Sequence, residues 1–196
     1  DALAFLRFAF NPFDDLSLLR MIAVAGHGIG AKTVQHLEAI GGTLGLPLFG
    51  VLLLVKDGPA AVHSHLPSLQ TFELPESFRS PFTSRTEQLL AGFTVLPERV
   101  LAEAQRLDVP SLLGFILRES GLQEQILDGS DEGQERWGNV RELASVASDF
   151  AGIDPQVGLA AFLEGVALSS EQDEYREGQD AVTLITLHAA KGLEFK

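Results

Sequence analysis

Apolar positions recur at three- and four-residue spacing over most of the chain, which is typical of amphipathic helices. The first helix should end at Asn11, because a residue that precedes a proline avoids the helical backbone region. Its apolar positions are Leu3, Phe5, Leu6, Phe8 and Phe10. A second helix should follow, capped by Asp14 or Asp15, whose carboxylates can accept hydrogen bonds from unpaired N–H groups.

Three further helices are predicted in the second half of the chain. Asp108 and Pro110 should open the first of them, and Gly121 is well placed to end it. Its apolar stripe is Leu112, Leu113, Ile116 and Leu117. The other two stripes are Val140, Leu143, Val146, Ala147 and Phe150, and then Leu159, Phe162, Leu163 and Val166. We interpret all three stripes as core faces.

Two regions depart from this helical pattern. Between residues 41 and 105, glycines and prolines interrupt short apolar runs, and we interpret residues 71–86 as a loop or insertion. Only Val182 to Leu187 alternates like a β-strand. The predicted fold is therefore mainly α: a helical subdomain over residues 1–169, an acidic linker over 170–180, and one C-terminal strand with its loop over 181–196.

Charge limits how the chain could bind nucleic acid. The net charge is −13, and residues 121–196 hold 15 Asp and Glu against 5 Lys and Arg. A chain without a broad basic face would have to contact DNA through backbone amides and a few placed cations.

Composition limits the other classes of site. Cysteine is absent, which excludes disulfides, thiolate metal sites and a cysteine nucleophile. His63 and His65 lack further spaced ligands, so we favour a loop over a metal site there. The longest apolar run, Leu44 to Val55, is too short to cross a bilayer, and no signal peptide is visible. We expect a cytoplasmic protein without a membrane partner, and, since there is no initiator Met, a piece excised from a longer chain.

The first candidate site is the Gly28-Ile29-Gly30 turn, with Lys32 and Thr33 at the start of the helix that follows. Glycines allow close approach of a ligand to the backbone, and the free N–H groups at a helix start favour an anion. This combination is suited to phosphate. The same spacing is also compatible with a plain glycine turn between helices.

The second candidate site is the terminal segment. Both faces of the strand Val182 to Leu187 are largely apolar, so we expect it inside a covered, parallel sheet. Polar residues cluster at its carboxyl end, where open α/β sheets bind ligands: Thr186, His188, Lys191, Gly192 and Glu194. Periodicity alone does not separate this interpretation from a strand with a polar loop.

The terminal stretch VTLITLHAAKGLEF closely resembles motif V of the superfamily 1 DNA helicases of the UvrD/PcrA/Rep type. Residues 1–33 are similar to the segment of that family that leaves domain 2A and enters the inserted 2B subdomain. RWGNVRELASVASDF and GLAAFLEGVALSSEQDE are similar to later 2B helices. The resemblance covers nearly the whole chain and is weakest across residues 41–105.

The resemblance implies roles for individual residues. Thr186 and His188 would contact single-stranded DNA. Gly192 would allow close approach of the nucleotide, and Glu194 would accept a hydrogen bond from the ATP ribose; the role of Lys191 is less defined. The Gly28–Gly30 turn would be the helix-hairpin-helix-like element that holds duplex phosphates. One departure is that Ala25 and His27 stand where the family often has Pro and Arg, which lowers the expected duplex affinity because an arginine would carry a permanent charge there.

The resemblance also implies the activity of a parent protein: ATP-driven unwinding of DNA in the 3′ to 5′ direction, with ATP and Mg²⁺, in DNA repair or replication and with possible repair protein partners. This chain contains no G-x-x-x-x-G-K-[ST] loop, so we expect neither ATPase activity nor a bound cofactor in it alone. Two alternatives remain: a helicase–nuclease subunit of the RecB or AddA type, and a non-catalytic acidic adaptor that binds protein partners through its helices.

Overall fold

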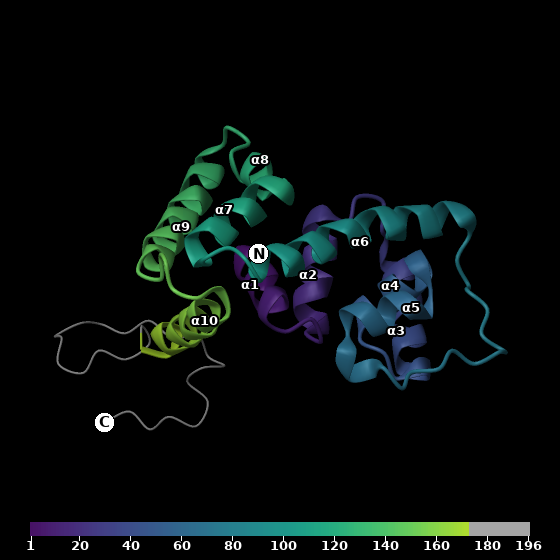
Figure 1. Cartoon of the computed structure of the whole chain (residues 1–196). Coiled ribbons are helices and arrows are strands. Elements are labelled where there is room, and N and C mark those ends of the chain that lie inside the picture. The colour runs from purple at the N-terminus through teal and green to yellow at the C-terminus, as the bar shows by residue number, and fades with distance from the viewer. Residues whose placement is uncertain (173–196) are drawn as a thin grey trace, which may run out of the picture. The chain divides into compact units, whose positions relative to one another are not determined.

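The computed structural model describes residues 1–172, and this part of the chain is mainly helical, as predicted (Figure 1). Its helices are α1 (Ala2–Phe10), α2 (Asp15–Ala25), α3 (Ala31–Leu44), α4 (Leu48–Asp57), α5 (Pro59–His65), the 3₁₀ turn η1 (Pro67–Leu69), α6 (Ser84–Ala104), α7 (Val109–Glu119), α8 (Leu122–Ile126), α9 (Asp131–Ser148) and α10 (Pro155–Gln172). Asp1–Glu164 form one compact unit, and a second unit begins at Gly165, within α10.

The strand Val182 to Leu187 lies outside the described residues, as does most of the predicted acidic linker. Helix α10 extends to Gln172, so the first residues of the segment predicted as a linker, 170–172, are helical.

Helix α1 ends where its sequence pattern predicts. Its C-cap residue Asn11 has an extended backbone and donates its N–H to Arg7 O at 2.8 Å. Phe5, Leu6 and Phe8 are fully buried, so this short helix contributes three large side chains to the core. It packs against α2, α6 and α7.

Helix α4 is the most enclosed element of the first unit. Leu48 to Leu54 are all buried, on every face of the helix, as expected of a helix that other helices surround. It contacts α2, α3, α5 and α6, and the ring of Phe49 packs edge-on against Phe8 at 5.2 Å between centroids. No single described helix has the length and apolar character to cross a membrane; α3 and α4 meet that criterion only as a pair, across a bend of 98°.

Helix α6 links the α3–α5 end of this unit to the α7–α9 end (Figure 1). It is 21 residues long, begins after the cap residue Thr83 and contains Pro97 in its interior. The hydroxyl of the buried Thr94 donates to Leu90 O at 2.7 Å. The segment before it, from residue 71, is irregular, which confirms the predicted loop except at Ser84–Thr86, the start of α6.

The second half of the chain follows its predicted stripes with one correction. Helix α7 opens at the cap residue Asp108, and Gly121 follows it with a left-handed backbone. The predicted core face of α9 is only partly correct: Ala147 is buried but Val146 is 43% exposed. Phe150 lies beyond the end of α9, and its ring packs on Phe162 of α10 instead, because the chain turns there.

Candidate nucleic-acid interface

The turn between α2 and α3 begins with a glycine that close packing requires. Gly26 donates its N–H to Ile22 O at 2.8 Å and so ends α2. A Cβ at this position would lie 2.5 Å from that same carbonyl oxygen. Side chains are therefore excluded at residue 26 by the path of the backbone itself.

The backbone conformation requires a second glycine at residue 28. Gly28 has φ +87°, a region that L-residues with a side chain rarely adopt. It is exposed on one side, and on the other it faces α6, where Leu89 Cδ1 lies 3.6 Å from the position of an ideal Cβ. Ile29 is half-buried and donates its N–H to Gly26 O at 2.9 Å, which closes the turn.

Gly30 differs from both, because nothing in the described part of the chain requires a glycine there. Its backbone, with φ −86° and ψ 168°, is open to any residue, and a Cβ would meet no atom within 4 Å. Gly30 is the N-cap of α3 and has no side chain with which to cap the first turn. The first N–H groups of a helix have no partners within the helix, so this start presents donors and the positive end of the helix dipole at an exposed surface.

Helix α3 holds the other predicted phosphate-site residues in place. Leu37 and Ile40 are buried beneath it, which anchors the helix. Lys32 is exposed, and Thr33 is half-buried and donates its N–H to Gly30 O at 2.9 Å. The structure thus brings Gly28, Ile29, Gly30, Lys32 and Thr33 together at one exposed helix start. The predicted residues Thr186, His188, Gly192 and Glu194 lie outside the described residues.

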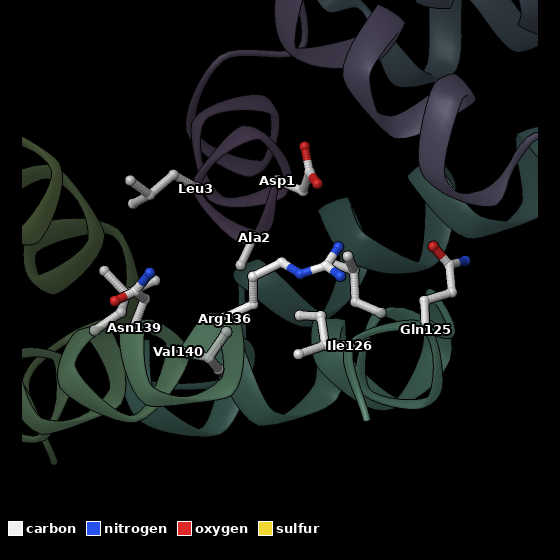
Figure 2. Close-up of a pocket in the computed structure, with 10 residues that line it drawn as sticks. Asp1, Ala2, Leu3, Gln125, Ile126, Arg136, Asn139 and Val140 are labelled. Carbon is white, nitrogen blue, oxygen red and sulfur yellow. The ribbon is translucent and has the colours of Figure 1, made fainter. Parts of the chain in front are cut away.

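A pocket of about 410 Å³ lies elsewhere, between α1, α8 and α9 (Figure 2). Its lining is mostly apolar, and its polar members are Asp1, Gln125, Arg136 and Asn139. Gln125 is engaged in the fold, since its amide donates to Val24 O at 3.0 Å. Neither this pocket nor any other place in residues 1–172 holds three metal-ligating side chains together.

The two histidines of the HSH sequence lie on helix α5, so the predicted loop is wrong there, and both have structural contacts. His63 Nε2 lies 2.8 Å from Phe72 O, and His65 Nδ1 lies 3.1 Å from Ala61 O. His65 Nε2 faces Glu98, which also pairs with Lys56. These contacts connect α5 with α6 and with the loop after η1.

The comparison with known families decides the identity of the chain. The family described as the UvrD-like helicase C-terminal domain matches residues 76–196, more than half of the sequence. The chain belongs to this family. The resemblance seen in the terminal stretch, and the assignment to UvrD-type helicases that followed from it, are thereby confirmed.

Several curated proteins are similar to this UvrD-like chain over its whole length. It is 29% identical over 202 residues to the ATP-dependent DNA helicase PcrA of Bacillus subtilis. It is 33% identical over 212 residues to the ATP-dependent DNA helicase UvrD1 of Mycobacterium bovis, and 27% identical over 205 residues to PcrA of Leuconostoc citreum. Each alignment covers 100% of the chain but only 24% or 25% of the relative, so the chain spans about a quarter of the length of these proteins.

Proposed function

We propose that residues 1–169 are the 2B-type subdomain of an ATP-dependent DNA helicase, with residues 181–196 its motif V, and that the subdomain holds the backbone of duplex DNA at the start of α3. The contact would be made by the main chain of Gly28, Ile29 and Gly30, with Lys32 and Thr33 beside it. Contacts of this kind fix the position of a protein on DNA without reading its sequence.

One observation carries this proposal: residue 30, at the start of α3, is a glycine although the fold does not require a glycine there. Gly26 and Gly28 are explained by packing and by backbone conformation. Gly30 is explained by neither, and it leaves the first turn of an exposed helix without a side-chain cap. A glycine at such a position allows a phosphate to approach the N–H groups closely.

The charge of the chain fits a contact made mainly by the backbone. With a net charge of −13, the chain as a whole repels DNA, so the attraction must be local. His27 is exposed at the turn. We therefore expect weak duplex binding that falls as salt is added.

The nucleotide chemistry belongs to the rest of the longer protein in this proposal. The chain has no phosphate-cradling G-x-x-x-x-G-K-[ST] sequence, so this proposal assigns ATP and Mg²⁺ to other parts of the longer protein. The contacts of Gly192 and Glu194 with nucleotide, and of Thr186 and His188 with single-stranded DNA, stay predictions. So do 3′ to 5′ unwinding, a role in repair or replication and a cytoplasmic location.

The test is the substitution Gly30→Asp. Aspartate is a good N-cap residue, so α3 should keep or gain stability, while a carboxylate at the helix start should repel phosphate. We expect the affinity for a short DNA duplex, measured by fluorescence anisotropy in low salt, to fall at least about tenfold, which corresponds to about 1.4 kcal/mol.

The matched control is Gly42→Asp, on the same helix. Gly42 is exposed, and a Cβ there would meet no atom within 4 Å. It lies twelve residues further along α3, about 18 Å away, and carries the same change of charge. Equal affinities of Gly30→Asp and the unaltered chain, or binding that does not respond to salt, would reject the proposal and favour the acidic adaptor.

A further inference from the structure

We propose that Arg85, in the first turn of α6, is a second phosphate contact on the same duplex surface as the turn before α3. This inference rests on the proposed function and extends it to a different helix. It assigns the surface two cations from separate elements, Lys32 and Arg85, in addition to the backbone of the turn.

Two contacts place the start of α6 beside the start of α3. Gly28, before α3, faces Leu89 of α6, with 3.6 Å between the ideal Cβ position and Leu89 Cδ1. The rings of His36 on α3 and Phe82, just before α6, lie 6.1 Å apart. Residues 82–89 therefore lie beside residues 28–36. Arg85 falls within the first of these stretches and Lys32 within the second.

The charged groups of Lys32 and Arg85 are available to a ligand. Lys32 and Arg85 are both exposed, and neither has a carboxylate partner within 4 Å in residues 1–172. By contrast, Lys56 of α4 pairs with Glu98 of α6, and Arg99 of α6 pairs with Glu119 of α7. Internal ion pairs thus account for those cations but not for Lys32 or Arg85.

The backbone that carries Arg85 is held firmly. Thr83 caps α6 through a hydrogen bond from Thr86 N at 3.3 Å. Leu90, the first buried residue of α6, is fully enclosed, and α6 packs along α4. An arginine on such a support loses less freedom when it binds, and its guanidinium offers several donors to one phosphate.

The chemistry points to the DNA backbone as the partner. An N-terminal helix turn and two cations all favour an anion, and the two stretches of chain that carry them lie side by side, where phosphates of one strand could meet them. Glu38 and Glu87 lie on the same two helices as Lys32 and Arg85, so the surface is not a broad basic patch. It should hold a few phosphates and read no sequence.

The test compares Arg85→Gln and Arg85→Lys with the unaltered chain by titrating a short DNA duplex at several salt concentrations. Loss of one phosphate contact should lower the slope of log K against log salt by about 0.9. The affinity gap between Arg85→Gln and the unaltered chain should therefore shrink by about 3.5-fold between 50 and 200 mM salt. Arg85→Lys should keep the full slope, because the charge remains.

The control is Arg141→Gln, which removes an exposed arginine from α9, away from this surface. It should shift the duplex affinity slightly at every salt concentration but leave the slope of log K against log salt close to its original value. If Gly30→Asp abolishes binding while Arg85→Gln keeps both affinity and slope, the role of Arg85 is rejected and the proposed function stands. If neither substitution changes binding, both are rejected.

Discussion

The starts of α3 and α7 use opposite solutions to the same physical problem. Both helices leave N–H groups without partners at their first turn. At α7, Asp108 accepts a hydrogen bond from Ser111 N at 3.1 Å and another from Gly152 N at 2.9 Å. At α3, the cap residue is Gly30, which has no side chain to offer.

The difference separates a structural helix start from one that is suited to a ligand. Asp108 closes the first turn of α7 and also binds the segment before α10, so its carboxylate is used within the fold. The first turn of α3 stays open to the surface, although serine or aspartate would fit at residue 30 without a clash. An anion could bind there without displacing any group of the protein.

Asp108→Ala should produce the largest loss of stability among substitutions at the two helix starts. Removal of an N-cap carboxylate costs about 1–2 kcal/mol, and here it also leaves the N–H of Gly152 without its partner. The free energy of unfolding from urea titration should fall by about that amount. Asp108→Asn should keep only part of it, because Oδ1 accepts from Ser111 and Oδ2 from Gly152, and an amide has a single acceptor oxygen. A loss below about 0.5 kcal/mol for the alanine variant would mean that water replaces the cap.

Gly28→Ala tests whether the turn before α3 needs the backbone conformation that glycine allows. With φ +87°, an alanine at this position should cost about 1–2 kcal/mol. Space is not the cause, since the nearest atoms of Leu89 lie at an ordinary contact distance. The same substitution at Gly45, which also has positive φ and open space around it, is a matched control and should cost a similar amount. Equal stability of Gly28→Ala and the unaltered chain would show that the turn changes shape easily.

Local signals in the sequence predict the helix starts better than they predict what those starts contact. The caps at Asp14 and Asp108 and the glycine after α7 follow from short patterns, and the structure confirms them. Helix α4 was not recognised, because it is apolar on every face and so has no periodicity. Pro97 similarly obscures the continuity of α6.

The candidate interface was predicted only in part, because short sequence patterns do not show which distant segments meet in the fold. The turn and the first residues of α3 are consecutive in sequence, so a motif could reveal them. Arg85 lies more than fifty residues further along the chain, and only the contacts of Leu89 and Phe82 bring it to this surface. The partner of Asp108 at Gly152 is a long-range contact of the same kind.

The pH dependence of stability should distinguish two aspartates at helix starts. The side chain of Ser111, followed by the N–H of Gly152, lowers the pKa of Asp108 below its ordinary value of 3.8. Its contribution is therefore present above pH 3.8 and is lost as the pH falls through the lower pKa of the folded state. Burial raises the pKa of Asp15, the first residue of α2, although Leu48 N donates to it at 2.7 Å. Its contribution is present below pH 3.8 and is lost as the pH rises through the raised pKa.

Urea titrations between about pH 2.5 and pH 6 would measure both effects. Asp108→Asn should remove part of the decline in stability at the acid end. Asp15→Asn should remove an opposing trend and so make the stability rise more steeply with pH. If Asp108→Asn made the stability rise more steeply with pH and Asp15→Asn made it rise less steeply, the hydrogen-bond arrangement at Asp108 and the desolvation of Asp15 would be contradicted.

Gly30→Ser should produce the smallest effect on stability, and its sign is informative. Serine is a slightly better N-cap than glycine, so the free energy of unfolding should rise by a few tenths of a kcal/mol at most. Gly26→Ser is a contrasting control, since its Cβ would clash with Ile22 O and should destabilise the chain clearly. A loss of about 1 kcal/mol or more for Gly30→Ser would show that the fold needs glycine there after all. A gain together with weaker duplex binding would mean that the glycine at the start of α3 serves the ligand at a small cost to the fold.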